Sequence, residues 1–180
     1  MRAVPITVTA LATALLLTAC GGGDDSSSDD AKSKAPTSSA GAPAGSACDL
    51  AAQVGPVNAA PAAGDSGNVT VTLTNKGSDC TLDGFPTVEL EADGAKAAVP
   101  ADAAAAPQKL TLPAQGTTSF TITYVRGEDG GDKSLAAKTA KYGLPGASAT
   151  ESFEWSYGAV ALKDGKTPDA SVSGFQQAGD

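Results

Sequence analysis

Histidine is absent from this sequence of 180 residues, and methionine and tryptophan each occur only once. Without histidine the chain cannot form the Ser-His-Asp or Cys-His arrangements of hydrolases, and it lacks a principal ligand of zinc and copper. The single methionine is Met1, which further disfavours a role as a copper carrier. The sequence also has no phosphate-binding glycine loop and no dinucleotide-binding glycine pattern. We therefore expect a protein that is not an enzyme and that uses no cofactor.

Positive charge is also scarce. The chain has 12 lysine and arginine residues against 20 aspartate and glutamate residues, which gives a net charge of −8. Because the phosphates of nucleic acids require a basic protein face, nucleic acid is not an expected partner. An acidic balance of this size favours solubility outside the cell.

Long apolar runs are limited to residues 3–17, which follow Arg2 near the N-terminus. This run is too short to span a bilayer core of about 30 Å as a helix, and it is typical of the apolar core of a signal peptide. Small residues follow it and lead directly into a cysteine. The four residues 17–20, Leu-Thr-Ala-Cys, resemble the lipobox of bacterial lipoproteins.

This resemblance implies that residues 1–19 are a lipoprotein signal peptide and that Cys20 receives a diacylglyceryl group. Two acyl chains, at about 0.8 kcal/mol per buried CH₂, would hold the protein to the extracytoplasmic face of the cell membrane. The alternative is a plain secretory signal with a chance cysteine, or an uncleaved anchor. Residues 20–46 are rich in Gly, Ser, Ala, Pro and Asp, which predicts a disordered tether with an end-to-end distance on the order of 28 Å.

Residues 47–180 have the length of one domain. If Cys20 carries lipid, Cys48 and Cys80 are the two cysteines that remain. We expect them to form a disulfide, because an exported chain meets an oxidising environment. Two buried thiols are the alternative, and a metal site is disfavoured because two cysteines without histidine are a poor ligand set.

Alternation of apolar and polar residues predicts half-buried strands at residues 69–75, 87–92 and 117–125. Shorter strands are expected at residues 96–99, 109–112, 151–155, 160–162 and 171–173. Residues 126–150 have the composition of a long glycine-rich loop, with a candidate short helix at 134–142. The alanine-rich residues 101–106 are a candidate for one helical turn. Six to eight short strands with frequent turn signals indicate an all-β fold, an antiparallel sandwich.

Several segments of the domain share the pattern of a known family. Leu-Thr-Asn-Lys-Gly-Ser begins at Leu73, Cys-Thr-Leu-Asp-Gly-Phe-Pro begins at Cys80, and Leu-Pro-Ala-Gln-Gly begins at Leu112. Together with the early Cys48, they resemble an uncharacterised domain family, a domain of unknown function, of secreted actinobacterial lipoproteins. The likeness covers roughly Cys48 to Val172. It implies an immunoglobulin-like β-sandwich with a cysteine pair, and it transfers no activity and no catalytic residue.

Carboxylates are the main remaining candidates for chemistry. Glu89 and Glu91 should point the same way from one strand at about 7 Å, a spacing that a glycosidase pair can use. Beside a hairpin turn, however, a solvated face is the favoured interpretation. Glu128, Asp129 and Asp132 could ligate calcium in a flexible loop, but their spacing is not that of an EF-hand and a solvated loop is favoured.

Aromatic residues offer one candidate ligand contact, Trp155 and Tyr157, which alternate along one predicted strand. An exposed aromatic pair can stack on sugar rings or anchor a partner. A lone tryptophan in a sandwich is more often part of the core, and we favour that interpretation.

These features favour a non-catalytic, lipid-anchored binding or adaptor module at the cell envelope. Its loops, especially residues 126–150, would meet an envelope protein, a polymer or a small ligand. The alternatives are a passive envelope spacer with no specific ligand and, less favoured, a glycan-active enzyme that uses carboxylates. A concave apolar or aromatic patch beside residues 126–150 would favour the binding module. A convex polar surface would favour the spacer. Two carboxylates that converge in a pocket would favour the enzyme.

Overall fold

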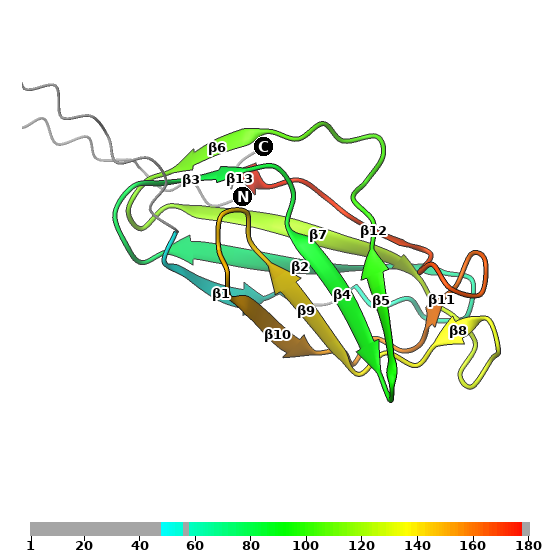
Figure 1. Ribbon diagram of the computed structural model, residues 1–180. Helices are drawn as coiled ribbons and strands as arrows, with labels where there is room; N and C mark the ends of the chain where they lie inside the picture. Colours follow the sequence, from blue (N-terminus) through cyan, green and yellow to red (C-terminus); the bar gives the residue numbers. More distant parts are fainter. Residues whose placement is uncertain (1–47, 56–57, 178–180) are drawn as a thin grey trace, which may run out of the picture. The chain divides into compact units, whose positions relative to one another are not determined.

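The computed structural model describes residues 48–55 and 58–177 of the chain (Figure 1). Within these residues the secondary structure consists of strands and contains no helix, so the described part of the chain offers no helix that could cross a membrane. The strands are β1 (Leu50–Val54), β2 (Ser66–Asn75), β3 (Cys80–Asp83), β4 (Thr87–Ala92), β5 (Ala95–Val99), β6 (Lys109–Leu112), β7 (Thr117–Val125), β8 (Ser134–Leu135), β9 (Thr139–Gly143), β10 (Thr150–Glu154), β11 (Val160–Ala161), β12 (Ala170–Val172) and β13 (Gln176–Gln177).

Two sheets form the two layers of the fold. The first has the strand order β1-β2-β7-β12, with β13 also paired to β7, and the second has the order β10-β9-β4-β5. All pairings between these strands are antiparallel, which confirms the prediction of an all-β antiparallel chain. Two short ribbons, β3-β6 and β8-β11, complete the strand pairing. In Figure 1 the second sheet lies in front of β2 and β7.

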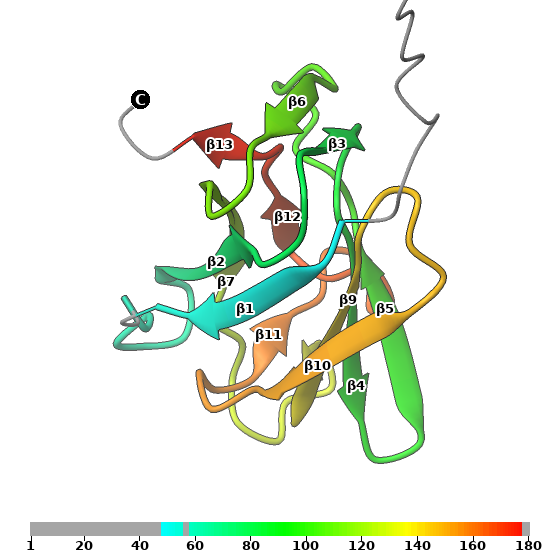
Figure 2. The ribbon, with the colours of Figure 1, turned by 90° about the vertical axis from the view of Figure 1, so that its left-hand side faces the viewer.

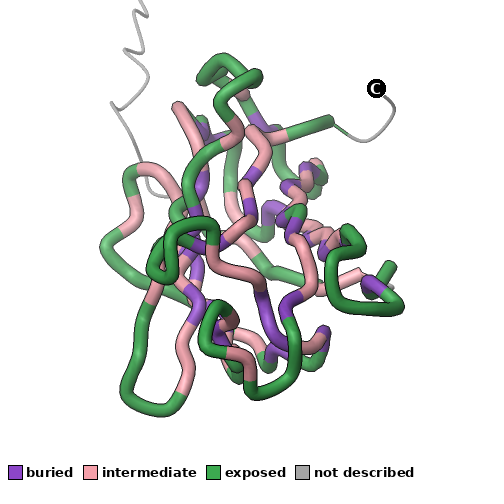
Figure 3. Tube along the Cα trace, turned by 90° about the vertical axis from the view of Figure 1, so that its right-hand side faces the viewer, coloured by how far each residue is buried: buried purple, intermediate pink, exposed green. Residues whose placement is uncertain are grey.

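The core lies between the two sheets and follows the alternation in the sequence. Val69, Val71 and Leu73 of β2 are fully buried, and so are Phe120 and Ile122 of β7. The residues between them are threonine and serine on the outer face of the first sheet. The second sheet contributes Val88, Leu90 and Tyr142, among others, to the same core cluster. Figure 3 shows the buried segments inside and the exposed loops around them.

Two helical predictions are wrong. Residues 134–142 form β8 and most of β9 instead of a helix, because Ala140 and Tyr142 are buried alternately between the neighbours β4 and β10. This packing overrides the helix propensity of the alanines and lysines. The predicted loop 126–150 is therefore a loop only in part. The segment 101–106 makes a β-turn in which Ala105 N donates to Asp102 O at 3.1 Å.

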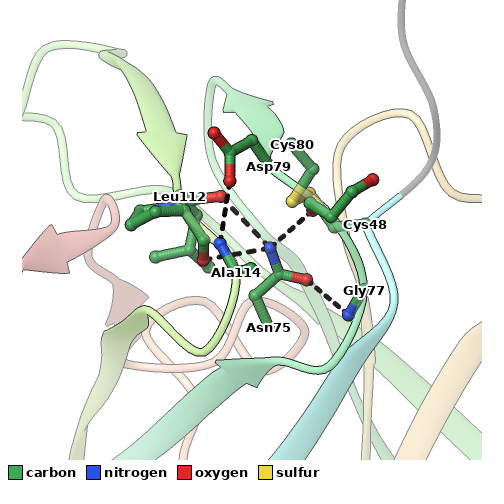
Figure 4. Close-up of a disulfide and its surroundings, with 9 residues drawn as sticks. Cys48, Asn75, Gly77, Asp79, Cys80, Leu112 and Ala114 are labelled. Atoms are coloured by element: carbon green, nitrogen blue, oxygen red, sulfur yellow. Dashed lines mark hydrogen bonds between the residues drawn. A yellow bond between two sulfur atoms is a disulfide. The ribbon is translucent and has the colours of Figure 1, made fainter.

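A disulfide and a buried asparagine hold the end of the fold at which the described chain begins (Figure 4). Cys48 precedes β1 and is bonded to Cys80 at the start of β3, with a Cα–Cα distance of 5.4 Å, so the predicted disulfide is present. It joins the edge of the first sheet to the β3-β6 ribbon across a sequence separation of 32 residues. A ring of this size stabilises a fold by about 3.7 kcal/mol in the chain-entropy model.

Asn75 is fully buried beside this disulfide. Its Nδ2 donates to the carbonyl oxygens of Ser78 (2.8 Å), Leu112 (3.1 Å) and Pro113 (3.1 Å), and its Oδ1 accepts from Gly77 N at 3.0 Å. One side chain thus satisfies backbone groups from the turn after β2 and from the end of β6. Because unpaired backbone groups are costly when buried, Asn75 fixes how these two segments meet.

We predict that Asn75→Ala lowers the free energy of unfolding by about 3 kcal/mol, because it leaves buried carbonyl oxygens without a donor. Urea denaturation followed by tryptophan fluorescence measures the change. Asn68→Ala is the matched control, because Asn68 is half-buried on the outer face and its side chain, among the described residues, accepts only from Thr123 Oγ1; the loss in this variant should stay below about 1 kcal/mol. Equal losses for the two variants would contradict the role given to Asn75.

Candidate functional site

A cleft of about 630 Å³ lies at the end of the fold where β7 leaves the first sheet. Its walls combine glycines and aliphatic side chains with charged ones. Among the lining residues are Gly64, Val125, Arg126, Glu128, Asp132 and Leu162. The cleft therefore meets the predicted loop 126–150 only along the first part of that loop. Its surface is concave and mixed in polarity, and the buried aromatic residues of this end do not line it.

The cleft and the disulfide lie at opposite ends of the β2-β7 pair. Ser66 pairs with Val125 at the cleft, whereas Asn75 ends β2 beside the disulfide. A strand of ten residues, at about 3.3 Å per residue, separates the two ends by roughly 30 Å. Figure 1 shows the same arrangement, with β8 and β11 at the end away from β3 and β6.

Arg126 ties together the loops that form the cleft. Its Nη1 donates to the carbonyl oxygens of Ala60 (3.2 Å) and Pro61 (3.5 Å), and its Nη2 lies 3.4 Å from Asp129 Oδ2. Gly158, at φ +85°, lies against the guanidinium group, where a Cβ would come within 3.0 Å of Nε. The Arg126 side chain is only 28% exposed, so its first role is to position backbone segments.

Tyr124 and two further aromatic residues form the base of this end. The Tyr124 hydroxyl donates to Tyr157 O at 2.8 Å and accepts from Ala60 N at 3.3 Å. The Trp155 ring packs edge-on against the rings of Tyr124 and Tyr157, at 5.1 and 4.9 Å between centroids. Its Nε1 donates to Gly158 O at 2.8 Å.

The positions of Trp155 and Tyr157 fit the core interpretation rather than an exposed ligand platform. Trp155 is 4% exposed and Tyr157 is 8% exposed. Burial also raises the pKa of Tyr157, with a smaller contribution from Tyr124. So little exposed surface leaves no ring face on which a ligand could stack.

The acidic loop after Arg126 is exposed. Glu128 and Asp132 line the cleft, whereas Asp129 turns to Arg126. Within the described residues, the structure brings together no group of three or more His, Cys, Asp or Glu side chains that could hold a metal ion. This arrangement is that of a solvated loop with an arginine partner.

Glu89 and Glu91 lie in a network of ion pairs on the outer face of the second sheet. Lys96 Nζ is 2.5 Å from Glu91 Oε1 and 3.4 Å from Glu89 Oε1, and Lys141 Nζ is 2.9 Å from Glu91 Oε1. Close contact with the ammonium groups of Lys96 and then of Lys141 lowers the pKa of Glu91. The Glu91 carboxylate is thus paired with two lysines on the outer face of the second sheet.

Cys20 lies outside the described residues, so its lipidation stays a prediction. Sequence reasoning missed the part that Arg126 and Tyr124 play at the cleft. Arg126 looked like the first residue of a glycine-rich loop, and Tyr124 like one more inward position of a strand. Their partners are main-chain groups of Ala60, Pro61 and Tyr157, and main-chain groups leave no signal in a sequence pattern.

We predict that Arg126→Ala lowers the free energy of unfolding by about 1–3 kcal/mol, because it removes hydrogen bonds from a charged donor to partly buried carbonyl oxygens. Thermal unfolding followed by circular dichroism measures the change. Lys133→Ala removes the same charge from the exposed rim of the same cleft and should cost less than about 0.5 kcal/mol. If the two variants are equally stable, Arg126 does not hold the loops together.

The comparisons with known proteins agree with the extent of this domain. No protein with a curated description matches the chain. A family model described as a domain of unknown function (DUF4232) matches residues 46–176, a span that contains every strand except the last residue of β13. This match confirms the prediction of an uncharacterised domain family. Because it covers well over half of the sequence, the chain belongs to the DUF4232 family.

Proposed function

We propose that the mature protein is a non-catalytic binding module that a lipid on Cys20 anchors to the extracytoplasmic face of the cell membrane. In this proposal the cleft at the end of β7 receives the ligand or partner. The two packed antiparallel sheets and the Cys48–Cys80 disulfide support an immunoglobulin-like sandwich as the scaffold. Modules of this architecture commonly bind through loops at one end of the sandwich.

The observation that carries this proposal is the placement of the cleft. The described chain begins at Cys48, beside the disulfide, and the cleft lies at the other end of β2 and β7. A tether that joins the domain at Cys48 is therefore attached at the end of the β2-β7 pair opposite the cleft, so it need not pass the cleft. A passive spacer has no need of a cleft whose loops are tied together by a partly buried arginine.

Capture of a partner from an envelope extract tests the proposal. The bait is the chain from residue 20 onward with Cys20→Ser, which contains every described residue. The cleft variant carries Glu128→Lys and Asp132→Lys, and the matched control carries the same charge change at exposed residues outside the cleft, Asp49→Lys and Asp83→Lys. We expect a protein or glycan that the control retains and that the cleft variant loses by about tenfold, since reversing two charges disrupts a complementary interface.

Two outcomes would contradict this proposal. Retention by both variants would place binding outside the cleft. Absence of any enriched molecule, with bait and variants equally folded, would favour the passive spacer. Folding is verified by the near-ultraviolet circular dichroism of the buried Trp155 and Tyr124.

Phase partitioning tests the anchor separately. We predict that the wild-type protein, processed to begin at Cys20, partitions into the detergent phase of a Triton X-114 extract, and that the chain produced from residue 20 onward with Cys20→Ser partitions into the aqueous phase, because it carries neither the apolar residues 3–17 nor acyl chains. Mass spectrometry of the wild-type N-terminal peptide should show a diacylglyceryl mass on Cys20. An unmodified Cys20 in the membrane fraction would contradict the anchor and leave the binding proposal to be judged on its own test.

A further inference from the structure

β1 is an edge strand of the first sheet, and its outer edge is open. Asp49 O accepts from Lys76 N at 2.7 Å, and Gly55 N donates to Thr70 O at 2.8 Å. In an antiparallel pair, only every second residue of a strand bonds a given neighbour. Because Asp49 and Gly55 bond β2, the even-numbered residues of β1 direct their N–H and C=O groups away from β2. These are Leu50, Ala52 and Val54. In the described part of the chain, no backbone hydrogen bond outside the strand ladders reaches these groups.

The other edges carry the usual protection against pairing with a further strand. Lys96 lies on β5, and Glu151 and Glu154 lie on β10. Val172 of β12 already bonds the main chain of residues 100–102. The β1 sequence, Leu-Ala-Ala-Gln-Val, contains neither a charge nor a proline. Because charged residues, prolines and covering segments are what protect sheet edges from further pairing, β1 is the unprotected edge at which another strand can pair.

β1 and β10, edge strands of the two sheets, both lie toward the viewer in Figure 2. A groove of about 320 Å³ is lined by residues of both strands. Leu50 and Val54 line one wall and pack against the core. Tyr142 and Phe153 line the other, with 6.4 Å between their ring centroids. The groove is thus apolar in its depth and bounded on one side by open backbone groups. An extended chain bound there would gain apolar contacts in the groove and main-chain hydrogen bonds with β1.

Glu151 places a negative charge at this groove. It lies two residues from Phe153 on the same face of β10 and pairs in register with Tyr142. Its charge adds to the effect of burial in raising the pKa of Tyr142, as a carboxylate close to the phenol would. A cationic group beside Glu151 would therefore find an unbalanced negative charge in an otherwise apolar groove.

We propose that β1 and this groove bind an extended peptide segment, which adds as a strand to β1, places alternate aliphatic side chains in the groove and sets a lysine or arginine beside Glu151. Strand addition of this kind obtains affinity from main-chain hydrogen bonds and specificity from alternate side chains. A second copy of the chain is the weaker occupant, because each copy carries a net charge of −8 and would bring Glu151 and Glu154 toward their counterparts. This site is separate from the end cleft and does not depend on it.

A synthetic probe tests the proposal on the chain from residue 20 onward with Cys20→Ser. The probe is acetyl-Lys-Thr-Val-Thr-Val-Thr-Lys-amide, which presents Lys, Val, Val and Lys on one face in either strand direction. We expect it to slow hydrogen exchange of the amides of Leu50, Ala52 and Val54 by about tenfold at saturation, because protected amides must open before they exchange. The same peptide with all its main-chain amides methylated cannot donate to β1 in either strand direction and should give no protection.

Two substitutions locate the contacts. Ala52→Pro removes an outward N–H without breaking the β1-β2 ladder, and it should abolish the protection at Leu50 and Val54. Glu151→Lys should weaken probe binding roughly fivefold. Glu154→Lys makes the same charge change on the same strand, on the opposite face and without lining the groove, and should leave binding nearly unchanged.

Distinct results would overturn the proposal. Protection of β5 or β10 amides instead of β1 would place the peptide elsewhere, and unaltered binding by Ala52→Pro would exclude strand addition to β1. Protection of β1 amides that rises with protein concentration in the absence of peptide would identify a second copy as the occupant. If Ala52→Pro fails to fold, equal protection by the methylated and unmethylated peptides is the decisive negative result.

Discussion

The pairing of β2 with β7 is the constraint on which the rest of the structure depends. Nine residue pairs in continuous register, from Ser66 with Val125 to Thr74 with Thr117, place two rows of large apolar side chains on one face. Because a strand alternates its faces strictly, a slip of one residue would expose both rows to water. The inner rows form half of the core, and the outer rows of threonine and serine leave the other face hydrated, with contacts such as that between the Thr70 and Thr121 hydroxyls at 3.1 Å.

Both ends of this pair are fixed by the same physical device, a polar side chain that bonds main-chain groups of neighbouring loops. Asn75 does so beside the disulfide, and Arg126 does so at the cleft. Loops between packed sheets bury carbonyl groups that no ladder can satisfy, and each of these side chains supplies several donors at once. The difference lies in exposure. Asn75 is fully buried, whereas the Arg126 side chain is partly exposed at the cleft.

Two open features follow from the way in which the sheets are closed. The loops after β7 do not cover the end of the core completely, which leaves the cleft around Arg126. Along one side, no strand among the described residues bridges β1 and β10, which leaves the groove beside Glu151. The ion pairs of Glu91 with Lys96 and Lys141 lie on the outer face of the second sheet, so the candidate carboxylates Glu89 and Glu91 are engaged with lysines there.

The sequence alone determined the strands that alternate without interruption, because alternation is a local property of neighbouring side chains. It also determined the cysteine pair and the family, because these follow from the number of cysteines and from short motifs. Residues 69–75 and 117–125 carry their burial pattern in their own side chains. Residues 134–142 do not: their alanines and lysines favour a helix locally, and only pairing of β8 with β11 and of β9 with β4 and β10 makes them strands. The roles of Arg126, Asn75 and the β1 edge were likewise decided by tertiary structure, because they depend on main-chain groups brought together from distant parts of the chain, and every residue carries the same main-chain groups.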